Sequence, residues 1–90
     1  MEQVLIVDDE EEISNMLIKC LSREGIKGIS SLHGQDALEK LRKQNIDLVI
    51  LDIMMADMDG FEVLRHIREM DMLFFLVRFR RNMIRYLDLD

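Results

Sequence analysis

Proline is absent from the 90-residue chain, and cysteine occurs once, at Cys20. A single cysteine excludes an internal disulfide and favours a reducing, cytoplasmic compartment. No run of about 18 uncharged apolar residues occurs, so the sequence predicts no membrane span, and no secretory signal precedes the first apolar run at Val4. The net charge of −6 argues against nucleic-acid binding by this segment.

Apolar residues make up 49% of the chain, which is enough for one small packed domain. Continuous apolar runs at residues 4–7 and 48–51 are typical of strands buried on both faces of a parallel sheet, and residues 26–31 form a weaker strand. Apolar spacings of three and four predict helices over residues 11–24, 34–44 and 60–69. This alternation predicts an α/β fold, a doubly wound parallel sheet with right-handed crossovers.

The first predicted helix carries one apolar stripe and is followed by Gly25, a typical residue after a helix end. Because Cys20 lies on this stripe, we expect its thiol in the core. The stripe consists of Ile13, Met16, Leu17, Cys20 and Leu21.

Carboxylates follow two of the predicted strands. Asp8 and Asp9 come directly after the first, and Asp52 comes directly after the third. In a doubly wound sheet with strand order 2-1-3, these strands are neighbours, and ligands gather at their carboxyl ends. Three converging carboxylates repel one another, and a hard divalent cation such as Mg²⁺ relieves that repulsion. The alternative is that these acids are solvated turn residues, which is the commoner situation for one isolated aspartate.

Three segments resemble the receiver domain of two-component response regulators. They are Leu5-Ile6-Val7-Asp8-Asp9-Glu10, Asp47-Leu48-Val49-Ile50-Leu51-Asp52-Ile53-Met54-Met55 and Asp57-Met58-Asp59-Gly60-Phe61-Glu62. The resemblance covers about residues 3–70 and implies a flavodoxin-like sheet with helices on both faces. It divides the chain into a receiver core over residues 1–70 and a divergent tail over residues 71–90.

The resemblance also implies roles for single residues. Asp52 is the expected phosphoacceptor, and a sensor histidine kinase is the expected donor and partner. Asp9 is the expected direct ligand of Mg²⁺, Asp8 supports the metal, and the backbone carbonyl of Met54 completes the protein ligands. Ala56 stands where the family usually has proline, which removes a stiffening residue but no ligand.

The resemblance ends after Glu69. The family continues with a fourth strand ending in serine or threonine, a helix, and a fifth strand ending in lysine. Here the last serine is Ser31 and the last lysine is Lys43. The sequence therefore predicts strand order 2-1-3-4, without the family's fifth strand and last helix.

A frameshift near codon 70 is one explanation. Joining the last base of each codon to the first two of the next forces Asp from Met83-Ile84 and an aliphatic residue from Arg85-Tyr86. The shifted frame can then read Tyr-Asp-Lys-Ile-Leu-Gly-Leu-Gly, which resembles the family's segment before its fifth strand. DNA codons that cannot encode serine and these glycines in the second frame would contradict the hypothesis.

The alternative is a divergent tail with a structure of its own. Residues 73–79 suit a fourth strand, and residues 80–87 form a candidate short basic helix. A sheet without its last elements exposes an apolar face and an edge, which predicts marginal stability or a homodimer.

Two functions remain open from the sequence. One is a signalling receiver phosphorylated at Asp52, without enzyme activity of its own. The other is a non-signalling remnant or interaction fragment that keeps the acidic pocket and lacks a competent switch. An enzyme acting on small phosphorylated substrates is a weak third candidate, because no general acid or substrate pocket is evident.

Overall fold

The computed structural model describes residues 2–52, 60–69, 74–79 and 83–88, with side chains over residues 2–52 and 62–69. Strands and helices alternate up to the fourth strand, as the apolar pattern predicts for residues 4–69. The elements are β1 (Gln3–Val7), α1 (Glu11–Arg23), β2 (Lys27–Ser31), α2 (Gly34–Lys43), β3 (Leu48–Asp52), α3 (Gly60–Glu69), β4 (Phe74–Phe79) and β5 (Met83–Asp88).

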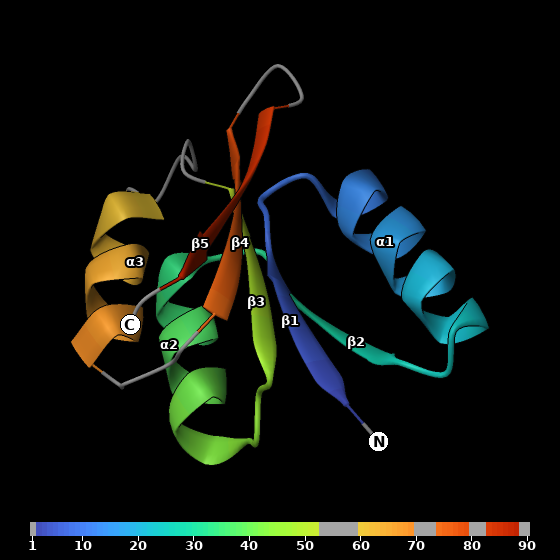
Figure 1. The fold of residues 1–90 in the computed structure, drawn as a ribbon, viewed down its shortest axis with the longest axis horizontal. Helices are drawn as coiled ribbons and strands as arrows, with labels where there is room; N and C mark the ends of the chain where they lie inside the picture. The colour runs from blue at the N-terminus through green and yellow to red at the C-terminus, as the bar shows by residue number, and fades with distance from the viewer. Residues whose placement is uncertain (1, 53–59, 70–73, 80–82, 89–90) are drawn as a thin grey trace.

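The strands form one sheet in the order β2-β1-β3-β4-β5. The first four strands in this order are parallel, which confirms the predicted doubly wound sheet and the order 2-1-3-4. Helix α1 covers one face, and α2 and α3 lie side by side on the other (Figure 1). Right-handed crossovers place α1 and α2 on opposite faces, because the chain moves from β1 to β2 in one direction along the sheet and from β2 to β3 in the other.

The core lies between the sheet and the pair α2 and α3. Alternate residues of β1 and β3 point into it, because side chains in a strand alternate between the two faces. Residues from both helices close the cluster, and every member is at most 2% exposed. It consists of Leu5, Val7, Ala37, Leu38, Val49, Leu51, Val63 and Ile67.

The face under α1 is covered less completely. Cys20 is exposed, so the prediction that its thiol lies in the core is wrong, and the Met16 side chain is 55% exposed. Helix α1 packs on β2 and β1, and within the described residues no second helix lies beside it on this face. Leu48 and Ile50, which alternate with the core positions of β3, are accordingly only half-buried.

Glycine at the end of α1 turns the chain into β2. Gly25 has φ +74°, its N–H donates to Ser22 O (3.0 Å), and the Ile26 N–H donates to Leu21 O (3.0 Å). These two bonds form a Schellman motif, whose left-handed residue is normally glycine because a Cβ disfavours that conformation. The helix end predicted at Gly25 is therefore confirmed.

The tail differs from the predicted short helix over residues 80–87. Residues Met83–Asp88 form β5, which pairs antiparallel with β4 from Phe79↔Met83 to Phe74↔Asp88. Ile84 and Tyr86 favour strands, and the free edge of β4 supplies hydrogen-bonding partners that an isolated short helix lacks. β5 is therefore a hairpin partner of β4, and it differs from the family's parallel fifth strand reached through a helix.

No helix within the described ranges combines the length and the apolar character needed to cross a bilayer.

Candidate functional site

Three acidic side chains gather where β1 ends. Carboxylate oxygens of Asp8, Asp9 and Glu10 all lie within 4.8 Å of one another. Asp8 is only 3% exposed, Asp9 is half-buried and Glu10 is exposed. The Glu10 N–H donates to Asp8 Oδ1 (2.9 Å), a short-range bond that bends the chain out of the strand and into α1.

Asp52 ends the neighbouring strand. β1 and β3 run parallel with Val7 opposite Leu51, so Asp8 and Asp52 occupy the next pair of positions. Asp52 is 1% exposed and is not one of the three acids grouped within 4.8 Å. The structure therefore joins Asp8 and Asp9 with Glu10, and places Asp52 at the end of the adjoining strand.

Hydrogen bonds at both ends of β1 hold it between its neighbours β2 and β3. At its carboxyl end, the Asp8 N–H donates to Ser31 O of β2 (3.1 Å). At its amino end, the Gln3 N–H donates to Asp47 Oδ2 (2.8 Å) and the Asp47 N–H donates to Gln3 O (2.9 Å). Asp47 directly precedes β3, so these bonds fix β3 beside β1 and bring Asp52 level with Asp8.

The donor set fits a hard cation. Carboxylate oxygens are the ligands that Mg²⁺ prefers, usually one or two from the protein together with water and phosphate oxygens. Oδ1 of Asp9 and Oδ2 of Asp52 are buried from solvent. Burying carboxylates at adjoining strand ends costs free energy, and a bound divalent cation offsets that cost.

Glu10 is a member of the acidic group that the sequence reasoning did not single out. It is the N-cap residue of α1, and its side chain makes no capping hydrogen bond to the helix. Its position directly after Asp8 and Asp9 was the available signal, but only the turn between β1 and α1 brings its carboxylate back to theirs.

Other predicted residues lie outside the described part of the chain. Met54, the predicted carbonyl ligand, and Ala56 belong to residues 53–59. Gly60 is the first residue of α3, where the sequence predicted the third helix to begin.

The strand on the far side of Asp52 carries a different residue type from the family pattern. β3 and β4 pair with Asp52 opposite Arg78. The sequence has no threonine, no serine after Ser31 and no lysine after Lys43. The backbone thus brings an arginine position, in place of a hydroxyl residue, level with the strand end that holds Asp52.

Comparison with known families agrees with this geometry. The model of the response regulator receiver domain matches residues 4–78, which extends past the predicted limit at residue 70 and includes most of β4. The chain belongs to the response regulator receiver family.

Relatives of this receiver include the transcriptional regulatory protein AfsQ1 of Streptomyces coelicolor, which is 38% identical over 82 residues, or 91% of the chain. That match covers 36% of AfsQ1, so the receiver spans about a third of this relative.

Solved structures agree as well. The response regulator TrrA of Thermotoga maritima, crystallised in complex with Mg²⁺–BeF, is 37% identical with a TM-score of 0.75, covering 88% of the receiver and 66% of that chain. A complex of the histidine kinase ThkA with TrrA matches with 35% identity and a TM-score of 0.83, covering 92% and 72%.

Proposed function

We propose that this receiver accepts a phosphoryl group on Asp52 from a phosphohistidine of a sensor histidine kinase, with Mg²⁺ at the adjoining acids. The observation that carries the proposal is the buried carboxylate of Asp52 at the end of β3, level with Asp8 on β1. The carboxyl ends of neighbouring parallel strands are where such folds bind ligands.

Asp8, Asp9 and Asp52 are the residues that would hold the metal, together with the backbone carbonyl of Met54. When bound, Mg²⁺ supplies positive charge that offsets the charge on the transferring phosphoryl oxygens. The Mg²⁺–BeF complex of TrrA supports this assignment by similarity. Glu10, exposed beside Asp8 and Asp9, adds negative charge that attracts the cation.

The chemical step is a transfer between two nucleophiles. A carboxylate oxygen of Asp52 attacks phosphorus, an O–P bond forms, and the P–N bond to the kinase imidazole breaks. The imidazole leaves with the electron pair and takes up a proton, and Asp52 becomes an acyl phosphate.

The partner and the compartment follow from the same proposal. The complex of TrrA with the kinase ThkA supports a sensor histidine kinase as donor. The one cysteine, Cys20, is free and exposed, which suits a reducing cytoplasm.

Treatment of the purified chain with acetyl phosphate and Mg²⁺ tests the acceptor. We expect one added phosphoryl group by intact mass, released by hydroxylamine as an acyl phosphate is. Asp52→Asn should abolish incorporation, because an amide does not form the acyl phosphate, and Asp9→Asn or EDTA should slow it. Glu39→Gln, an exposed acid on α2, is the matched control and should behave as the wild type. Incorporation that persists in Asp52→Asn would overturn the assignment.

The alternative is a receiver that keeps the acidic pocket and does not switch. The observation that favours it is β5, which pairs antiparallel with β4 and brings no lysine or serine to the strand ends. A ligand shifts a conformational equilibrium only through groups that contact it differently in the two states. Amide shifts that change on phosphorylation only around Asp52 would support this alternative, and changes that spread to β4 and β5 would favour the signalling receiver.

A further inference from the structure

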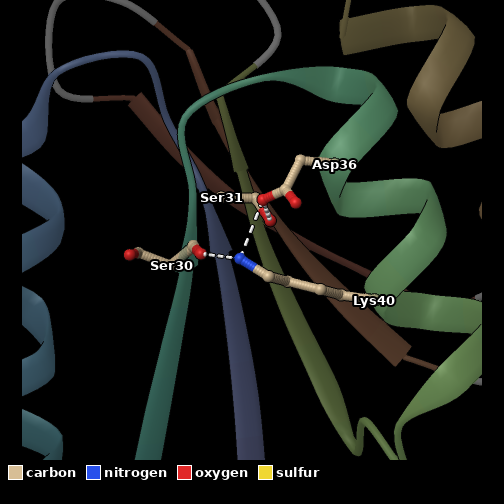
Figure 2. Close-up of polar contacts among 4 residues, drawn as sticks. All are labelled: Ser30, Ser31, Asp36 and Lys40. Atoms are coloured by element: carbon tan, nitrogen blue, oxygen red, sulfur yellow. Dashed lines mark hydrogen bonds and ion pairs between the residues drawn. The ribbon is translucent and has the colours of Figure 1, made fainter.

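A cluster of polar side chains joins β2 to α2 (Figure 2). The Ser31 hydroxyl donates to Asp36 Oδ2 (2.8 Å), and Lys40 Nζ donates to the same oxygen (2.8 Å). Lys40 Nζ also donates to Ser30 O (2.5 Å). We call these four residues, Ser30, Ser31, Asp36 and Lys40, the β2–α2 clamp.

The clamp compensates for the position of β2 at the edge of the sheet. In a parallel strand, the N–H and C=O of one residue point to the same side, and the next residue points to the other. Ser31 O faces β1, where it accepts from Asp8, so Ser30 O faces the open edge of β2. The ammonium of Lys40 reaches across from α2 and satisfies this edge carbonyl, which also blocks the pairing of a further strand.

A continuous series of bonds leads from the clamp to the acidic group. Lys40 Nζ and the Ser31 hydroxyl both donate to Asp36 Oδ2, and the Ser31 carbonyl accepts from the Asp8 N–H (3.1 Å). Asp8 Oδ1 in turn accepts from the Glu10 N–H (2.9 Å), and the turn so formed carries Asp9. Ser31 is only 1% exposed, so its hydroxyl and carbonyl act in a setting where water competes poorly.

We propose that Lys40 is a positioning residue for the cation site, acting through Asp36 and Ser31 on the backbone of Asp8. The proposal rests on the proposed function, because it takes the acids that follow β1 as the Mg²⁺ ligands. Groups that orient metal ligands are as much a part of a metal site as the ligands, and their loss weakens binding.

Charge and positioning predict opposite effects of removing Lys40. A positive charge near the acids repels Mg²⁺, so charge removal by itself tightens Mg²⁺ binding. Loss of the clamp frees the peptide that holds Asp8, so loss of positioning weakens Mg²⁺ binding. The direction of the change therefore separates the two explanations.

The experiment titrates the wild-type chain, Lys40→Met and Lys43→Met with Mg²⁺, following the amide signals of Asp8, Asp9 and Glu10 by NMR. Lys43 lies exposed in the same helix and is the control for the lost charge. We expect Lys40→Met to bind Mg²⁺ about tenfold more weakly, the low end for loss of an outer-shell partner. Lys43→Met should bind as tightly as the wild type or slightly more tightly. Equal affinities in the two variants would overturn the proposal.

Hydrogen exchange without metal gives a second, independent readout. In Lys40→Met, the Asp8 amide should exchange about tenfold faster, as expected when a charged hydrogen bond nearby is lost, with the Val49 amide unchanged. Asp36→Asn should produce the same local effect, and Lys40→Arg should restore protection. An equal increase in the exchange rates of the Asp8 and Val49 amides would mean general destabilisation and would contradict a positioning role. If the wild type binds no Mg²⁺, the proposed function fails, whereas the exchange at Asp8 still supports or overturns the link itself.

Discussion

At the scale of single residues, the charge of Asp36 depends on its two partners. The hydrogen bond from Lys40, followed by the bond from Ser31, lowers the pKa of Asp36 below its ordinary value of 3.8, and partial burial acts in the opposite direction. A folded-state pKa that lies below the unfolded one means that the ionised carboxylate stabilises the fold. This contribution is complete above the unfolded value of 3.8 and is lost as the pH falls through the lower folded value.

Asp36→Asn should therefore have a pH-dependent cost. At pH 7 we expect the free energy of unfolding to fall by about 0.5 kcal/mol. The value is small because the Asp36 side chain is 44% exposed, so solvent screens its ion pair with Lys40. The gap between wild type and variant should narrow as the pH falls below 3.8. Urea unfolding followed by circular dichroism across this range measures it. Glu39→Gln is the control. If the difference in free energy of unfolding between wild type and Asp36→Asn stays constant down to the lowest pH at which the chain is folded, the lowered pKa of Asp36 does not stabilise the fold as stated.

At the scale of elements, two glycines shape the connection between α1 and β2 for different reasons. Gly25 is needed for its backbone, since its φ is +74° and a Cβ at this position would meet no atom within 4 Å. Gly28 is needed for space, because a Cβ there would lie 2.9 Å from Ile18 Cγ1 and 3.2 Å from Ile18 Cα. The close approach of α1 to β2 thus depends on the missing side chain at Gly28.

Gly28→Ala should destabilise the chain by about 1–3 kcal/mol, the usual cost of overpacking. Ile18→Ala should relieve much of that cost, so that the two changes are coupled by more than about 0.5 kcal/mol in a double-mutant cycle. Gly25→Ala is the matched control: it should cost about 1–2 kcal/mol through the left-handed backbone, with no relief from Ile18→Ala. Additive effects of Gly28→Ala and Ile18→Ala would contradict the steric explanation.

Helix α1 also shows how neighbouring elements decide burial. Its apolar stripe predicts a buried Cys20, because a stripe of that width normally faces a core. The helix covers only β1 and β2, so Met16 and Cys20 lie on a flank that no described element covers. The periodicity identified the helix correctly, and the missing neighbour made the burial prediction wrong.

At the scale of the whole molecule, helices bury one face of the sheet more completely than the other. Val49 and Leu51 are fully buried under α2 and α3, whereas Leu48 and Ile50 are half-buried on the α1 side, where Met16 is 55% exposed. A partly covered apolar surface of this kind, around Leu48, Ile50 and Met16, favours self-association.

We expect the chain to dimerise through this face, with a thermal transition that shifts to higher temperature as the concentration rises. Light scattering and melting curves over a range of concentrations measure this. Met16→Glu should favour the monomer, and Glu39→Gln, on the opposite helix layer, should not. A cooperative transition in a dilute monomer, independent of concentration, would contradict the expectation.

The local sequence determined the strands β1 and β3, the points where they end and the end of α1. Apolar runs at residues 4–7 and 48–51 specify strands because only a buried strand accommodates apolar residues on both faces, and the acids that follow them mark where the strands end. Glycine at position 25 stops α1 because other residues avoid its backbone conformation. The placement of Asp8 and of Asp52 at strand ends therefore followed from patterns within ten residues of each, whereas the pairing that makes these two strands neighbours joins distant segments of the chain.

Only the tertiary structure decided the remaining features, because each depends on residues far apart in the chain. Residues 83–88 form a strand instead of a helix since β4 offers them an open edge. Lys40 lies against Ser30 since α2 packs back across β2, and that packing turns an ordinary surface lysine into a link to Asp8. Short-range sequence patterns do not show which strand edge of the sheet stays unpaired or which helix has no helix beside it. Those long-range features determine the exposure of Cys20 and the hydrogen-bond partners of Lys40.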